Sequence, residues 1–145
     1  MLAPYYRFRV LNSTDQTITY DSGGRIEVSI VKWKFDTDGS LIYSAEAAES
    51  FLSAGQSLAA AAEDEGTFID NTTDLYLGFK GTLNIIADAN STDGTIYLYM
   101  EESMDNTDWP SDKADFAIAA DMIFLCALSL STDAEDEGRS KNFEF

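Results

Sequence analysis

The sequence contains no histidine, and this absence narrows the chemistry that the chain can perform. Histidine is the commonest general base, the central member of the Ser-His-Asp triad and a frequent ligand of catalytic zinc. We therefore expect a protein that is not an enzyme and that uses no cofactor and no metal ion.

Cysteine occurs once, as Cys126, which excludes an internal disulfide. The apolar setting of this residue, MIFLCALSL, predicts a buried and unreactive thiol.

Sequence signals for secretion and for membrane insertion are also missing. The N-terminal residues MLAPYYRFRV lack the pattern of a signal peptide, and the longest apolar stretch, 116–130, contains Asp121 and is too short to span a bilayer.

Basic residues are scarce: nine lysines and arginines face 26 acidic residues, which gives a net charge of −17. This balance argues against binding to nucleic acid or to an anionic membrane, because phosphate contacts need clustered basic side chains. The charge is unevenly spread, since residues 1–35 carry +2 and the remainder −19. Such a split suits self-association through complementary surfaces, and a simply solvated acidic surface is the alternative.

The chain has 145 residues, of which 45% are hydrophobic, enough for one folded domain over 1–145 with its own core. Short alternating segments separated by turn residues predict a mainly β fold, an antiparallel β-sandwich or jelly roll. The expected strands cover 5–11, 16–20, 25–35, 41–43, 67–69, 75–86, 95–100, 122–130 and 139–145.

Several details of strand arrangement follow from these patterns. We expect segment 5–11 at a sheet edge, where its arginines stay hydrated. Segment 25–35 changes its apolar face after Ile30, which predicts a bulge or a strand that passes between sheets. Segment 36–40 predicts a hairpin turn, and we expect 75–86 to form a hairpin with 95–100. The last strand must pair in its own sheet or in a neighbour's.

A short helical insert is expected near 45–60, where alanine and glutamate replace the β-branched residues. Ala48, Phe51 and Leu52 share one face at helical spacing, which predicts a helix over 45–53 that ends near Gly55. Residues 56–62 form either a second helical turn or an alanine-rich strand.

The acidic segment 101–108, followed by Trp109 and Pro110, is the most obvious candidate site. Its carboxylates could bind Ca²⁺, although their spacing fits no calcium motif. Paired carboxylates could also serve a glycosidase, the weakest of the alternatives. Trp109 beside Tyr97 and Tyr99 could form a platform for a sugar or a subunit contact, and ordinary core packing explains it equally well.

The run TIYLYMEESMDNTDWPSD resembles a pattern in small structural proteins of tailed bacteriophages, and the ending RSKNFEF is similar to theirs. The resemblance covers about the last third of the chain. It implies a virion β-sandwich protein that acts by assembly without catalysis. The matching residues are Tyr97, Leu98, Tyr99, Glu102, Ser103, Asp105, Trp109, Pro110, Ser111 and Asp112.

We therefore expect a virion structural protein that binds copies of itself and other virion proteins, without specific nucleic-acid or membrane binding. A place in the tail or the head–tail junction is favoured, because an acidic wall lets DNA slide past. The alternatives are a capsid decoration protein and a carbohydrate-binding module for host recognition. The residues expected at subunit interfaces are Tyr5, Arg7, Arg9, Trp109, Pro110, Phe143 and Phe145.

Overall fold

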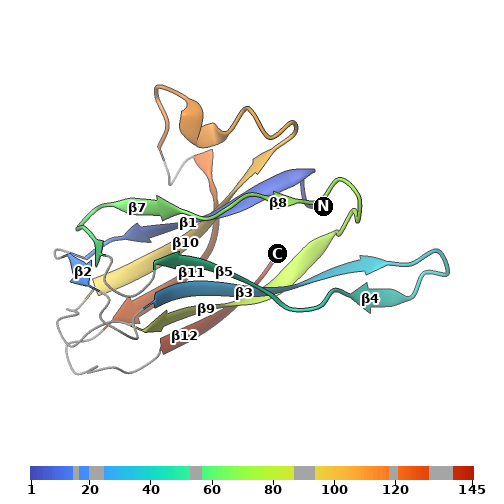
Figure 1. Ribbon diagram of the computed structural model, residues 1–145, viewed down its shortest axis with the longest axis horizontal. Helices are drawn as coiled ribbons and strands as arrows, with labels where there is room; N and C mark the ends of the chain where they lie inside the picture. Colours follow the sequence, from blue (N-terminus) through green and yellow to red (C-terminus); the bar gives the residue numbers. More distant parts are fainter. Residues whose placement is uncertain (15–16, 20–24, 53–56, 87–93, 118–120, 131–138) are drawn as a thin grey trace.

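A computed structural model describes residues 1–14, 17–19, 25–52, 57–86, 94–117, 121–130 and 139–145 (Figure 1). Two antiparallel sheets pack face to face, which confirms the predicted β-sandwich. Within the described residues, no helix is long and apolar enough to cross a membrane. Apart from single residues, the helical structure in the described part of the chain is one 3-10 turn, η1 (Pro110–Asp112).

The two sheets are called sheet I and sheet II, and each has five strands. Sheet I has the order β11-β10-β1-β7, with β8 also paired to β1; sheet II has the order β12-β9-β3-β4, with β5 also paired to β3. The strands of sheet I are β1 (Tyr5–Asn12), β7 (Glu63–Glu65), β8 (Ile69–Asp70), β10 (Gly94–Ser103) and β11 (Ile123–Leu130). Those of sheet II are β3 (Arg25–Phe35), β4 (Leu41–Tyr43), β5 (Ala47–Leu52), β9 (Gly78–Ile86) and β12 (Arg139–Glu144). A separate small pair is formed by β2 (Ile18–Thr19) and β6 (Ser57–Leu58).

The core lies between the two sheets and is filled by alternate residues of the long strands, as the period of a strand requires. Its centre is a group of rings in which Phe79 of β9 packs against Tyr6, Phe8, Phe143 and Phe145. The centroids of these ring pairs are 5.5 to 5.9 Å apart, within the range of favourable aromatic contacts.

Two glycines of β9 allow aromatic side chains to approach its backbone closely. A Cβ atom at Gly81 would lie 2.6 Å from the Phe143 ring, and one at Gly78 would lie 2.8 Å from the Trp33 ring. Both distances are too short for any side chain larger than hydrogen. Glycine within a strand is typical of positions where another group approaches the backbone closely.

The prediction that the first strand lies at a sheet edge is wrong. β1 lies between β10 on one side and β7 and β8 on the other. Its arginines are largely buried, and they are paired because carboxylates of the neighbouring strands face them. A buried arginine is acceptable when it is paired and hydrogen-bonded.

The predicted helix over 45–53 is also wrong, because residues 47–52 form strand β5 and pair with β3. Tertiary pairing overrides a local helical preference here, since β5 covers the edge of β3 and places Phe51 in the core. Residues 57 and 58 form β6, and the part of the insert at 53–56, with Gly55, lies outside the described residues.

The expected hairpin between 75–86 and 95–100 does not exist. β9 pairs with β3 and β12 in sheet II, whereas β10 pairs with β1 and β11 in sheet I. Both strands have one apolar face, so alternation predicts that each packs on the core but does not say which strand lies beside it. The last strand, β12, pairs in its own sheet, with β9.

The change of face within β3 coincides with a change of partner. β3 pairs with β9 without interruption from Arg25 to Trp33, so the expected bulge after Ile30 is absent from that side. On its other side, β3 pairs first with β5 and then, from Trp33 to Phe35, with β4. The predicted turn at 36–40 joins β3 to β4, with Gly39 at a φ of 81°.

Replacement of Phe79 by alanine should lower the free energy of unfolding by about 3–5 kcal/mol, because it removes the ring at the centre of the core. Urea denaturation measures this loss. Phe124→Ala is the control, because the Phe124 side chain is 55% exposed and its removal should cost less than about 1 kcal/mol. Equal losses for the two variants would contradict the assigned core.

Candidate functional site

Glu101, near the end of β10, is a charged residue with no exposed side-chain surface. Its Oε1 atom accepts hydrogen bonds from Nε of Arg7 at 2.6 Å and from Nε of Arg9 at 2.8 Å. Ser111 donates its hydroxyl to Oε1 at 3.1 Å and its backbone N–H to Oε2 at 3.2 Å. We call Glu101, Arg7, Arg9 and Ser111 the Glu101 cluster.

Strand register explains why these side chains meet. Arg7 lies directly opposite Glu101 in the β1–β10 pair, and Arg9 is the next residue along the same face of β1. Because side chains of a strand alternate, this is the face of sheet I that points away from the core. The segment 104–117 folds over that face (Figure 1), and its Trp109 ring lies 4.3 Å from the Arg7 guanidinium carbon.

Strand β7 supplies further negative charge to the cluster. Glu63 lies 3.0 Å from Nη1 of Arg9, and Glu65 forms ion pairs with both Arg9 and Arg7. Burial alone raises the pKa of Glu101, but hydrogen bonds from Arg9, Arg7 and Ser111 outweigh it and hold the pKa below its ordinary value of 4.5. The carboxylate is therefore ionised and fully engaged by the protein's own donors, so it does not face a substrate.

The remaining carboxylates of the acidic segment have local roles or lie open to solvent. Backbone N–H groups of Thr107 and Asp108 donate to Oδ1 of Asp105, and they hold the pKa of this residue at about 2. Glu102 accepts a hydrogen bond from the backbone of Ala3. Over the part of the chain that the structure describes, no group of three or more potential ligands is arranged to hold a metal ion.

The structure brings four of the seven expected interface residues together. Arg7, Arg9, Trp109 and Pro110 meet at or beside the Glu101 cluster, where Trp109 is only 7% exposed. The other three lie elsewhere: Tyr5 packs edge-on against Phe68, Phe143 is buried in the core, and Phe145 is half-buried and stacks on Phe79. Their contact with another subunit stays a prediction.

The proposed aromatic platform is not assembled. Tyr97 and Tyr99 pack around Phe124 of β11, with ring centroids 6.3 and 5.7 Å from that of Phe124. Trp109 instead lies beneath Arg7 and is buried. A sugar therefore has no access to the Trp109 ring in this arrangement.

A second candidate site, which the sequence did not single out, is a hairpin that extends beyond the sandwich at the right of Figure 1. We call residues 31–44, the end of β3 with β4, the arm. One face of the arm is anchored, since the ammonium groups of Lys32 and Lys34 lie 4.8 and 4.9 Å from the Tyr76 ring centroid. Lys34 also donates a hydrogen bond to the backbone of Asp74 at 2.7 Å.

The other face of the arm is apolar and open. Phe35, Leu41 and Tyr43 are 56%, 47% and 54% exposed, although each is a large hydrophobic or aromatic side chain. They border a hollow of about 560 Å³. Its lining residues are Trp33, Phe35, Leu41, Tyr43, Lys80, Glu144 and Phe145. The signal in the sequence is the change of apolar face after Ile30, which directs Trp33 and Phe35 outward.

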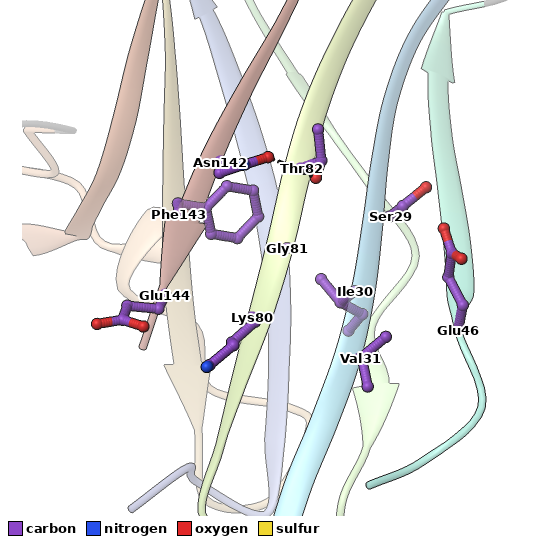
Figure 2. A pocket seen from close by; sticks show the side chains of 10 residues that line it. All are labelled: Ser29, Ile30, Val31, Glu46, Lys80, Gly81, Thr82, Asn142, Phe143 and Glu144. Atoms are coloured by element: carbon purple, nitrogen blue, oxygen red, sulfur yellow. Dashed lines mark hydrogen bonds between the residues drawn. The ribbon is translucent and has the colours of Figure 1, made fainter.

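A second hollow, of about 600 Å³, adjoins the first on the outer face of sheet II (Figure 2). Ser29, Thr82 and Asn142 form a row across β3, β9 and β12. The Thr82 hydroxyl donates to Oδ1 of Asn142 at 2.9 Å, as Figure 2 shows. Lys80 and Glu144 line both hollows, so the two lie side by side.

Replacement of Glu101 by glutamine should destabilise the protein by about 3 kcal/mol near neutral pH. This is the low end for breaking a buried ion pair, because Glu63 and Glu65 still face the arginines. The lowered pKa of Glu101 means that its stabilisation is present above its ordinary pKa of 4.5 and is lost as pH falls through the folded-state value. Wild-type stability should therefore fall more steeply with acid than that of the variant.

Denaturant titrations between pH 7 and pH 3 measure both effects. Glu144→Gln is the matched control, because Glu144 is exposed and outside the cluster. A Glu101→Gln variant as stable as this control, with the same pH profile as wild type, would show that the cluster does not support the fold.

Comparison with known proteins yields no match: no protein-family model, no curated protein and no solved structure corresponds to this chain. No relative can therefore lend the chain an activity or a ligand. What the protein does has to be inferred from its own surfaces, above all from the arm and the two hollows beside it.

Proposed function

We propose that the chain is a non-enzymatic virion structural protein of a tailed bacteriophage, which assembles with copies of itself and with other virion proteins. The observation that carries this proposal is the open apolar face of the arm, where Phe35, Leu41 and Tyr43 are about half exposed. A place in the tail or at the head–tail junction fits the acidic remainder of the chain.

Exposed apolar side chains that adjoin one another mark interaction surfaces in soluble proteins. Trp33 pairs across the hairpin with Tyr43, and Phe35 pairs with Leu41, so these four form one continuous apolar face. Aromatic residues are enriched in protein interfaces, where they supply contact area at a low cost in side-chain entropy. The arm is therefore suited to contact another protein rather than to remain in water.

The distribution of charge supports assembly through the arm. Residues 31–44 contain Lys32, Lys34, Asp36 and Asp38 and are therefore neutral overall, whereas the whole chain carries −17. Two copies repel each other least where their surfaces carry no net charge. The acidic body keeps copies soluble and apart except at the arm.

The phage-like run of the sequence supports the same class of protein in a different way. Trp109 and Ser111, two of the residues that carry the resemblance, cover Arg7 and bind Glu101. These residues therefore hold the segment 104–117 on sheet I. A pattern with this structural role is consistent with a scaffold that serves assembly.

Replacement of both Phe35 and Tyr43 by serine should abolish self-association while leaving the fold intact, because these side chains are exposed in the single chain. Sedimentation velocity over a range of protein concentrations measures the association. Phe124→Ser is the control, since Phe124 is equally exposed but lies on sheet I.

Particles purified from the organism that encodes the chain provide the second part of the test. Mass spectrometry and antibody labelling should detect the protein in them, and the symmetry of its positions separates rings in the tail or junction from icosahedral decoration. A wild-type protein that stays monomeric at every concentration and is absent from particles would refute the proposal.

A carbohydrate-binding function is the second candidate, and the row of polar side chains in the second hollow is the observation that favours it. Ser29, Thr82 and Asn142 offer uncharged hydrogen-bonding groups on an open sheet face (Figure 2). The half-buried Trp33 ring lies in the adjoining hollow. Sugars need both hydroxyl partners and an apolar surface, which these hollows provide side by side.

If this candidate function is correct, Trp33→Ala should abolish binding on a glycan array, because it removes the aromatic surface of the site. Trp109→Ala is the matched control, since Trp109 is buried beneath Arg7 and should not alter glycan binding. The array is run with and without a chelator, to separate binding that depends on Ca²⁺. Absence of binding by the wild-type protein in both conditions rules this candidate out.

A further inference from the structure

Among the described strands, β4 pairs with β3 alone. Its other edge therefore has no partner strand. Asp36 N donates to Ser40 O at 2.9 Å, and Ser44 N donates to Lys32 O at 2.8 Å. In an antiparallel pair, every second residue bonds toward its partner strand. Ile42 therefore bonds toward β3, and the N–H and C=O groups of Leu41 and Tyr43 point to the open edge.

This edge lacks the charged side chains that protect two other edge strands of the molecule. β4 reads Leu-Ile-Tyr, without a charge, a proline or a bulge. By contrast, β7 consists of three acidic residues, and β12 carries Lys141 and Glu144. An unprotected apolar edge is a template for pairing with another strand.

We propose that β4 pairs with the β4 strand of a second copy of this chain, antiparallel and about a two-fold axis at Ile42. The inference rests on the proposed function, because it names the contact through which copies assemble. In this register Leu41 lies opposite Tyr43 of the second copy, and both exchange the backbone hydrogen bonds that their open edges offer. The strand is thus complementary to itself, as an interface with two-fold symmetry requires.

The side chains agree with this register on both faces of the joined arms. On the open face, Leu41 meets Tyr43 of the second copy, and Phe35 and Trp33 extend the apolar layer on either side. On the opposite face, Ile42 meets Ile42 of the second copy. Cross-strand pairs of aromatic and branched side chains are the units that stabilise a sheet.

Shape and charge favour a second copy over other partners. The arm extends past the rest of the sandwich (Figure 1), so two antiparallel arms place the two bodies at opposite ends. The arm carries no net charge, and so it does not attract a strongly basic partner, which the acidic body would bind instead. The paired surface is small, and we expect a weak dimer that forms at high protein concentration.

An intermolecular disulfide tests the register. Residue 42 lies opposite itself in a pair that is not hydrogen-bonded, where Cα atoms are about 4.5 Å apart, a distance that a disulfide spans. Mild oxidation of Ile42→Cys should therefore give a covalent dimer at a rate that rises with protein concentration. Thr37→Cys is the control, because the proposed register places the two copies of this exposed turn residue far apart. The native Cys126 is buried.

Leu41→Pro tests the pairing of the open edge in a second way. Its N–H points to the open edge, so proline removes a donor of the proposed contact and none of the bonds between β3 and β4. We expect this variant to sediment as a monomer with an unchanged urea midpoint. Wild-type dimers that persist in Leu41→Pro overturn the inference.

The two proposals fail in different ways. If the wild-type protein self-associates but Ile42→Cys cross-links no faster than Thr37→Cys, this pairing is wrong and the assembly function stands. If the wild-type protein shows no self-association at any concentration and is absent from particles, both proposals are wrong.

Discussion

The organisation of sheet I depends on the ion pairs that Arg7 and Arg9 form with the buried carboxylate of Glu101. A charge without exposed surface is tolerable only when donors surround it, and here those donors come from β1 and from the segment 104–117. Two of the nine basic residues of a strongly acidic chain are used for this purpose. The same arginines reach Glu63 and Glu65 of β7, so one cluster ties together three parts of the chain that are far apart in sequence.

The sequence predicts the local features of this fold but not the contacts between distant strands, of which the Glu101 cluster is an example. Strand alternation is local, so it predicts the sandwich, the long strands and the turn at 36–40. It cannot show neighbours across the sheet, so it wrongly predicts a hairpin of β9 with β10 and a helix in place of β5. The sequence marks Arg7 and Arg9 as candidates for a subunit interface, yet their partner is Glu101, an acidic residue about ninety positions away. The arm was missed because alternation gives the direction of a side chain, but not whether anything covers it.

The finished molecule has a body built around a packed core and an arm with an open apolar face and strand edge. In the body, aromatic rings fill the core around Phe79, and Arg7 and Arg9 of β1 are paired with Glu101 of β10. In the arm, an apolar face and an unpaired strand edge remain open to solvent. This division suits a subunit that folds independently and then joins copies of itself, with its acidic surface limiting contacts elsewhere.

Hydrogen exchange of single amides, measured at low and at high protein concentration, tests this division most directly. The account predicts that Leu41 and Tyr43 exchange rapidly in dilute protein and become protected as concentration rises. Ile42, which bonds toward β3, and the amides of β10 beside Glu101 should be equally protected at both concentrations. Exchange at Leu41 and Tyr43 that is independent of concentration would contradict the claim that the arm is completed by a second copy.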